Sequence, residues 1–165
     1  MANLSRVAAA MRRLDAVATV TREYRGADVP AAVQLLIDEL LAEFPGLGTC
    51  KEYLDFLAHG GGAHISNARF SLGIHGFEGY VVSALSERAL LDQERYFLFA
   101  ELLLLEEDEE IFFFFDLGSR GGDFEVPVCW RTVENPVYVK FSDSFGSFLE
   151  RCAEGDLNIP GEVPK

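Results

Sequence analysis

Two apolar runs of strand length dominate the hydrophobic pattern of this chain, at residues 96–105 and 111–117, and five acidic residues at 106–110 separate them. This outline predicts a β-hairpin whose strands are apolar on both faces. Strands of this kind need cover on both sides, so we expect them at the centre of a sheet. Alternation along a strand assigns its side chains to the two faces of the sheet. In the first run, one face carries Phe97, Phe99, Leu103 and Leu105, and the other carries Leu98, Leu102 and Leu104. In the second run, one face carries Ile111, Phe113, Phe115 and Leu117, and the other carries Phe112 and Phe114.

Before the hairpin, apolar residues at helical spacing predict a short amphipathic helix and a longer second helix. The stripe of the first consists of Leu4, Val7, Ala8, Met11 and Leu14. The second covers residues 33–44 after a cap at Asp28, and Pro45 ends it. Residues 18–23 fit either a strand or an extended link.

Two further helices are predicted from their ends. Thr49 and Glu52 have the spacing of a capping box, and the three glycines at 60–62 end the helix that this box would open. The last helix should begin at Ser142 or Asp143. Its apolar face consists of Phe145, Phe148, Leu149 and Cys152.

Additional strands are expected over residues 70–75, 80–82, 124–130 and 137–141, with turns at 76–79 and 118–123. Pro127 should place its strand at an edge or a bulge. Consecutive strands with short connections indicate an α+β fold. We expect an antiparallel sheet of about five to six strands, with mixed pairing left open, and two N-terminal helices and one C-terminal helix packed on it.

The 165 residues are close to the usual size of one domain, so we expect a single domain over residues 1–165. Within it, residues 1–28 form an N-terminal extension with a short helix, and residues 29–155 form the core. Residues 156–165 contain two prolines and lack an apolar face, which predicts a weakly anchored tail.

Charge favours one class of partner. The chain has a net charge of −13, and the acidity is concentrated after residue 28. Such a body repels nucleic acid and anionic membranes and attracts basic proteins. An alternative explanation, that acidity only keeps a small protein in solution, fits the composition equally well. Without an apolar leader segment or a membrane span, we expect a cytoplasmic protein.

The residues with catalytic or metal-binding chemistry do not form a known site. His59 followed by three glycines resembles the oxyanion loop of esterases, yet the chain has no Gly-x-Ser-x-Gly elbow, so a glycine helix stop is favoured. His59, His64 and His75 lack metal-ligand spacing. Cys50, Cys129 and Cys152 are expected as buried thiols in a reducing compartment. We therefore expect no enzyme and no cofactor.

Five motifs, in this order, resemble the SUKH superfamily, which includes Syd and the fungal cell-wall-assembly regulators. They are Phe44-Pro45 with Tyr53-Leu-Asp-Phe56-Leu57 and Gly60-Gly61, Gly73-Ile-His-Gly76-Phe77-Glu78, Phe113-Phe-Phe-Asp116, Asn135-Pro136-Val137-Tyr138, and Ser144-Phe145-Gly-Ser-Phe148-Leu149. The match spans residues 33–152 and identifies 29–155 as a SUKH-like core.

The resemblance implies a protein-binding module without catalysis, most often an immunity protein that neutralises a bacterial toxin such as a basic nuclease. Acidity supports this independently, because an acidic protein can cover a phosphate-binding surface. The expected partner-binding residues are Glu106, Glu107, Asp108, Glu109 and Glu110, with Asp116 and Asp123 as weaker candidates.

Several alternatives stay open. The acidic linker could instead be a solvated turn that guards two aggregation-prone strands. The chain could also be a regulatory scaffold that binds a host protein, as Syd and the fungal relatives do, or a hydrolase that uses His59 and a serine. Homo-oligomers are compatible with the sequence.

Overall fold

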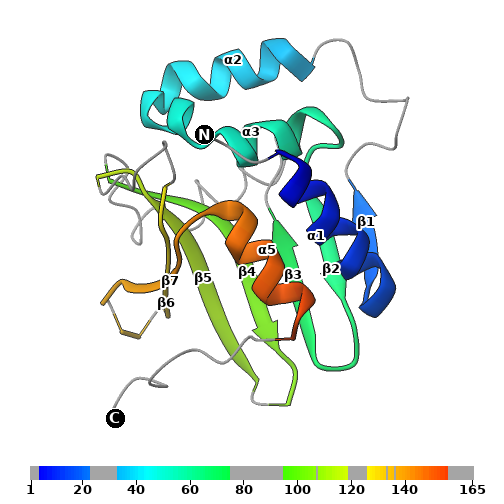
Figure 1. Cartoon of the computed structure of the whole chain (residues 1–165). Coiled ribbons are helices and arrows are strands. Elements are labelled where there is room, and N and C mark those ends of the chain that lie inside the picture. Colours follow the sequence, from blue (N-terminus) through cyan, green and yellow to red (C-terminus); the bar gives the residue numbers. More distant parts are fainter. Residues whose placement is uncertain are drawn as a thin grey trace.

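The computed structural model describes residues 4–22, 33–74, 95–106, 108–118, 126–132, 134–135 and 137–155. In these ranges seven strands form one antiparallel sheet in which each strand pairs with its neighbour along the chain (Figure 1). They are β1 (Thr19–Arg22), β2 (Ala63–Ser66), β3 (Phe70–Ile74), β4 (Tyr96–Leu104), β5 (Glu109–Asp116), β6 (Val128–Arg131) and β7 (Val139–Ser142). The α+β class is confirmed, with a slightly higher strand count than expected.

The helices of the described ranges are α1 (Leu4–Val17), α2 (Val33–Glu43), the 3₁₀ helix η2 (Pro45–Thr49), α3 (Lys51–Ala58) and α5 (Phe145–Ala153). In Figure 1, α1 and α5 lie side by side over one face of the sheet, while α2 lies beyond α3 at one end. Helix α1 buries Val7, Ala10 and Leu14, whereas Ala8 of the expected stripe is exposed. The N-terminal extension therefore contributes a helix and the edge strand β1 to the fold.

The apolar hairpin occupies the middle of the sheet, as its pattern predicted. Phe113 and Phe115 are buried on the helix side, where Phe115 stacks on Phe99 with ring centroids 4.1 Å apart. On the other face Leu98, Phe112 and Phe114 form a second buried cluster, against which Tyr96 and Tyr138 pack. Both faces of the central strands are thus buried over most of their length, and this explains why their sequence shows no regular polar alternation.

A β-bulge in β4 corrects the predicted division of its side chains. Leu98 pairs with Phe114 but Ala100 pairs with Phe113, so Phe99 is an extra residue. One extra residue reverses the facing of every later side chain. Leu102 and Leu104 consequently face the helix-side core with Phe97 and Phe99, whereas Leu103 and Leu105 are 36% and 45% exposed.

Two predicted helix caps are also wrong. Helix α3 begins after Cys50 without a side-chain cap, because Thr49 lies in η2 and its hydroxyl donates to the Gly46 carbonyl at 2.9 Å. Ser144 caps α5 in place of Ser142 or Asp143, and its Oγ accepts from Ser147 N–H at 3.2 Å. The glycine stop of α3 is confirmed, since Gly61 has a positive φ of 69°.

The structure also answers two open questions about the strands, whereas several other predictions cannot be compared with it. Residues 18–23, left open above, include strand β1. Strand β6 begins just after Pro127 and lies inside the sheet, with a register shift in its pairing to β7. The predictions for the cap at Asp28, the segment 75–94, the turn beyond residue 118 and the tail 156–165 fall outside the described residues.

Candidate protein-binding site

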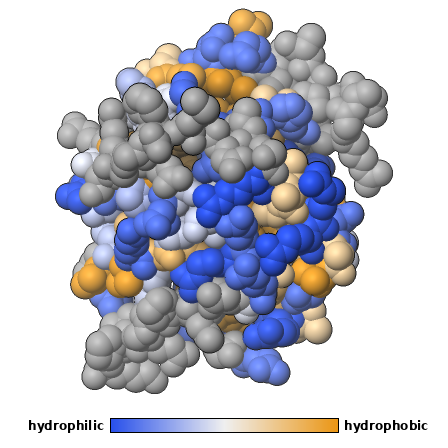
Figure 2. Space-filling model, viewed as in Figure 1, coloured by the Kyte–Doolittle hydropathy of each residue, from blue (hydrophilic) through white to orange (hydrophobic). Residues whose placement is uncertain are grey.

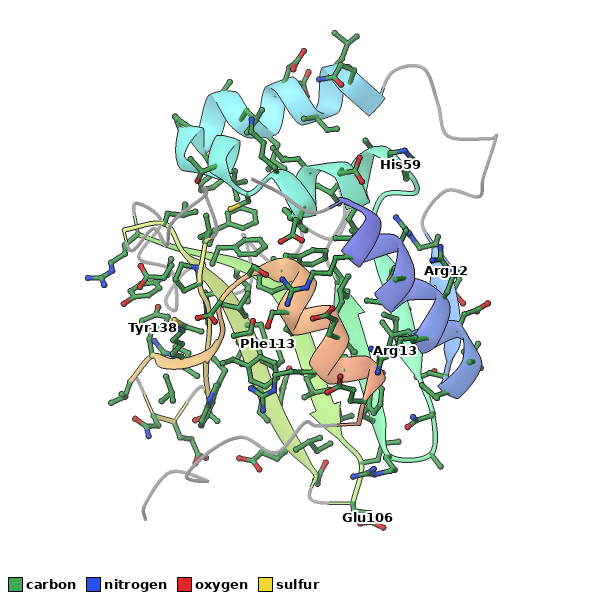
Figure 3. All side chains as sticks on the ribbon, in the orientation of Figure 1. Arg12, Arg13, His59, Glu106, Phe113 and Tyr138 are labelled. Carbon is green, nitrogen blue, oxygen red and sulfur yellow. The ribbon has the colours of Figure 1, made fainter. Side chains whose placement is uncertain are left out.

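The connection between β4 and β5 carries most of the predicted site residues. We call residues 103–106 and 108–110 the hairpin tip. Leu104 is the last residue of β4 and pairs with Glu109, so the turn spans residues 105–108. Asp108 has a positive φ of 49°, a conformation that Asp tolerates better than most residues. Figure 3 shows Glu106 at the outer end of the hairpin, away from the helices α2 and α3.

The carboxylates of the hairpin tip face solvent. Glu106, Asp108 and Glu110 are exposed and Glu109 is half-buried. Within the described part of the chain, none of these four residues forms a salt bridge. Four neighbouring negative charges that form no salt bridge within the described ranges create a negative potential that a basic surface can relieve. Glu107 belongs to the same turn by sequence but lies outside the described residues.

The structure does not bring Asp116 to the tip. It ends β5 at the opposite end of the hairpin, about 23 Å from Glu109 by strand rise. Its carboxylate accepts from Arg95 Nε at 3.0 Å and Nη2 at 3.4 Å, and from Gly118 N–H at 3.2 Å. Arg95 and Asp116 flank the apolar runs, so a hairpin register could have predicted this pair. Asp123 lies outside the described residues.

The internal Asp116 carboxylate belongs to an aromatic cluster on the sheet face opposite α1 and α5. Tyr96 and Tyr138 stack with centroids 3.6 Å apart, and Arg131 lies 5.5 Å from the Tyr138 ring. Burial, and then the charge of Asp116, raises the pKa of Tyr96. Burial also raises the pKa of Cys129 to about 11, so this thiol stays protonated and unreactive at neutral pH.

A second buried carboxylate, Glu52, was interpreted from sequence as half of a capping box. Its Oε1 instead accepts from Gly146 N–H at 3.3 Å, at the beginning of α5. A carboxylate at this position accepts from a backbone N–H that has no partner within the helix, and its negative charge interacts favourably with the positive end of the helix dipole. Arg6 of α1 donates to Glu150 at 2.7 Å and reaches Ser144 Oγ at 3.5 Å. These polar contacts join α1, α3 and α5 and are structural.

The face over α1 and α5 has a different character from the hairpin tip. Figure 2 shows it as largely hydrophilic. Its charges are partly neutralised by pairs between the two helices, including Arg6 with Glu150 and Arg13 with Glu154 at 3.4 Å. A surface of paired charges offers less net potential to a partner than the tip does.

The histidines do not assemble a hydrolytic site from the described residues. His59 is largely exposed, and among the described residues its Nδ1 contacts only Asp55, at 2.8 Å from the carbonyl oxygen. His64 Nε2 lies 2.9 Å from Ser71 Oγ, but its other ring nitrogen has no hydrogen-bond partner in the described ranges. A serine nucleophile also needs a group that orients the histidine and an oxyanion hole. His75 lies outside the described residues.

Two further observations concern metals and membranes. In the described ranges, no three His, Cys, Asp or Glu side chains lie together in a way that could hold a metal ion. Likewise, no described helix combines the length and apolarity needed to cross a bilayer.

No protein-family model and no curated protein matches this chain. The resemblance to the SUKH superfamily therefore depends on the order of the packing motifs alone.

Proposed function

We propose that this chain is a non-catalytic, SUKH-like protein-binding module that neutralises a basic bacterial toxin, as immunity proteins do. The observation that carries the proposal is the exposed acidic tip of the central hairpin, whose described carboxylates form no salt bridge with other described residues. An acidic site on an acidic body attracts a basic partner over several ångströms and speeds its association.

The position of the tip supports this role. Both strands that carry it are buried along most of their length, and each pairs with a neighbour on its other side. The described residues of the tip thus lie at the end of two strands that are paired on both sides. A tip held in this way loses little conformational freedom on binding, which favours affinity.

The chemistry of the partner follows from the charge. Nucleases hold phosphates with lysine and arginine, and an immunity protein can occupy that basic surface. The net charge of −13 argues against binding to nucleic acid or to an anionic membrane. The proposed contact residues are Glu106, Glu107, Asp108, Glu109 and Glu110, while the internal ion pair of Asp116 supports a structural role for that residue.

The experiment is a growth and binding test with the product of a neighbouring gene. If that product is toxic, co-expression of this chain should restore growth, and the purified proteins should bind in surface-binding kinetics. Glu106→Gln, Glu107→Gln, Glu109→Gln and Glu110→Gln together remove four charges. The association rate should then fall by about tenfold at low salt, and less at moderate salt.

A matched control removes four exposed charges elsewhere, with Asp15→Asn, Asp38→Asn, Glu39→Gln and Glu134→Gln. Because both variants have the same net charge, only a local role of the tip separates them. Equal kinetics for the two variants would show that the acidic linker is only a gatekeeper. Absence of growth rescue by the parent chain would contradict the immunity function.

A further inference from the structure

The hairpin tip is not purely acidic, because two leucines are exposed among its carboxylates. Leu103 and Leu105 are 36% and 45% exposed, and they belong to a small set of large apolar side chains that the described residues leave in solvent. Leu103 lies directly opposite Glu110 in the β4–β5 pairing, and Leu105 precedes Glu106. Arg69 also lies beside Leu105, whose N–H donates to the Arg69 carbonyl at 3.0 Å. The two leucines therefore form an apolar spot whose rim is mainly acidic.

The bulge at Phe99 is what places these leucines outside. Before the bulge, Phe97 faces the helix-side core, and after it Ala100, Leu102 and Leu104 do so. In an unbulged strand Leu103 and Leu105 would share the buried face of Phe97. Bulges disrupt ladder hydrogen bonds and are enriched where a side chain is redirected at a functional site. The bulge thus decides which leucines are exposed: Leu102 and Leu104 stay in the helix-side core, and Leu103 and Leu105 are left in solvent.

The partner that fits this spot has an apolar depression rimmed by lysine or arginine. An interface with an apolar centre and a charged rim is common among protein complexes, and rim charges set partner choice and association rate. Two copies of this chain would bring two acidic rims together, which like-charge repulsion opposes. Polyanions are opposed for the same reason. The charge around the leucines thus selects a basic protein surface.

We infer that Leu103 and Leu105 are the apolar anchor of the partner-binding site, and that the surrounding carboxylates steer a basic, apolar-pocketed protein onto it. This inference rests on the proposed function and names the contact that holds the complex. Loss of the leucines should increase the dissociation rate, whereas loss of the carboxylates should reduce the association rate.

The test uses two synthetic amphipathic peptides of equal positive charge, one of lysine and leucine and the other of lysine and serine. The full chain should bind the Lys/Leu peptide about tenfold more tightly, because burying the exposed remainder of both leucines is worth roughly one decade. Leu103→Ser with Leu105→Ser should abolish this preference while weak, salt-sensitive binding of both peptides persists.

The matched control is Leu35→Ser with Val137→Ser, two side chains that are 65% and 58% exposed. Leu35 is in α2, at the opposite end of the molecule from Glu106 (Figures 1 and 3). This control should keep the preference. A tip variant that keeps the preference, or a control that loses it equally, overturns the inference. Amide chemical-shift changes with the Lys/Leu peptide should centre on residues 103–110, and changes centred elsewhere also overturn it.

The two proposals fail in distinguishable ways. Tip-dependent peptide binding without growth rescue leaves the anchor intact and contradicts the immunity function. Growth rescue and toxin binding that the leucine variant does not weaken support the immunity function and refute the anchor.

Discussion

Replacing Leu102 and Leu103 separately by alanine tests the bulged register of β4 directly. The two residues are adjacent and chemically identical, but they lie on opposite faces of the sheet. Leu102 is completely buried, whereas Leu103 is 36% exposed beside Glu110. Without the bulge their roles would be exchanged, with Leu103 facing the core beside Phe97. The order of the two stability losses therefore reports the register.

The magnitudes follow from burial. Leu102→Ala removes an enclosed side chain and leaves a cavity in the helix-side core, which costs about 2–5 kcal/mol. Leu103→Ala loses only part of the transfer free energy of its side chain, and solvent fills the space. We expect it to cost about 1 kcal/mol or less. For a chain of this size the melting temperature should fall by roughly 2–4 °C per kcal/mol.

Equilibrium unfolding in urea, followed by far-UV circular dichroism, measures both losses. The dependence of the free energy of unfolding on urea concentration should stay unchanged, so the difference in stability should appear only as a shift in the urea concentration at the unfolding midpoint. Leu102→Val is a milder second variant in case the alanine variant does not fold, and it should still cost more than Leu103→Ala. Equal losses, or a larger loss for Leu103→Ala, would refute the bulge and the outward position of Leu103.

Two further predictions concern the polar contacts around α5. A Cβ on Gly146 would lie 2.5 Å from Glu52 Oε2, so Gly146→Ala should cost about 1–3 kcal/mol. In urea unfolding, the double variant with Glu52→Ala should lose less stability than the sum of the losses of the two single variants. Losses that simply add would show that the two residues are not in contact. The hydrogen bond from Arg6 holds the pKa of Glu150 below its ordinary value of 4.5, which stabilises the fold above that pH. The free energy of unfolding of the parent chain and of Arg6→Gln should be measured at several pH values. The difference between the two should be largest near about pH 6 and should become smaller as the pH falls below 4.5. A difference that does not change with pH would contradict this prediction.

The features that the sequence predicted correctly depend on local periodicity. The central hairpin, the helix over residues 33–44 and the final helix each carry their pattern within one segment. The turn at the acidic linker follows from the same pattern, because charge interrupts two apolar runs. Its exposure could therefore be expected before the structure.

The features that the sequence did not predict depend on contacts between distant residues, or on strands whose two faces have similar hydrophobicity. In β4 both faces are mostly apolar, and only Glu101, which simple alternation would place on the buried face of Phe97, marks the reversed facing after Phe99. The facing of Leu103 follows from that reversal and not from its own neighbours. Glu52 has the spacing of a capping box, but its partner Gly146 is 94 positions away. The outward leucines matter most for the proposed site, and they were assigned to the wrong group for this reason.

The contact between α1 and α5 also has a consequence for synthesis. The ion pair of Arg6 and Glu150 joins residues 144 positions apart. At about 5–20 residues per second, the ribosome needs roughly 7–30 s to reach the second after making the first. During that interval α1, which buries Val7, Ala10 and Leu14, lacks its contacts with α5. The nascent chain can form its local hairpins and the contacts of α1 with β1 and α3 early, but the packing of α1 on α5 is completed last.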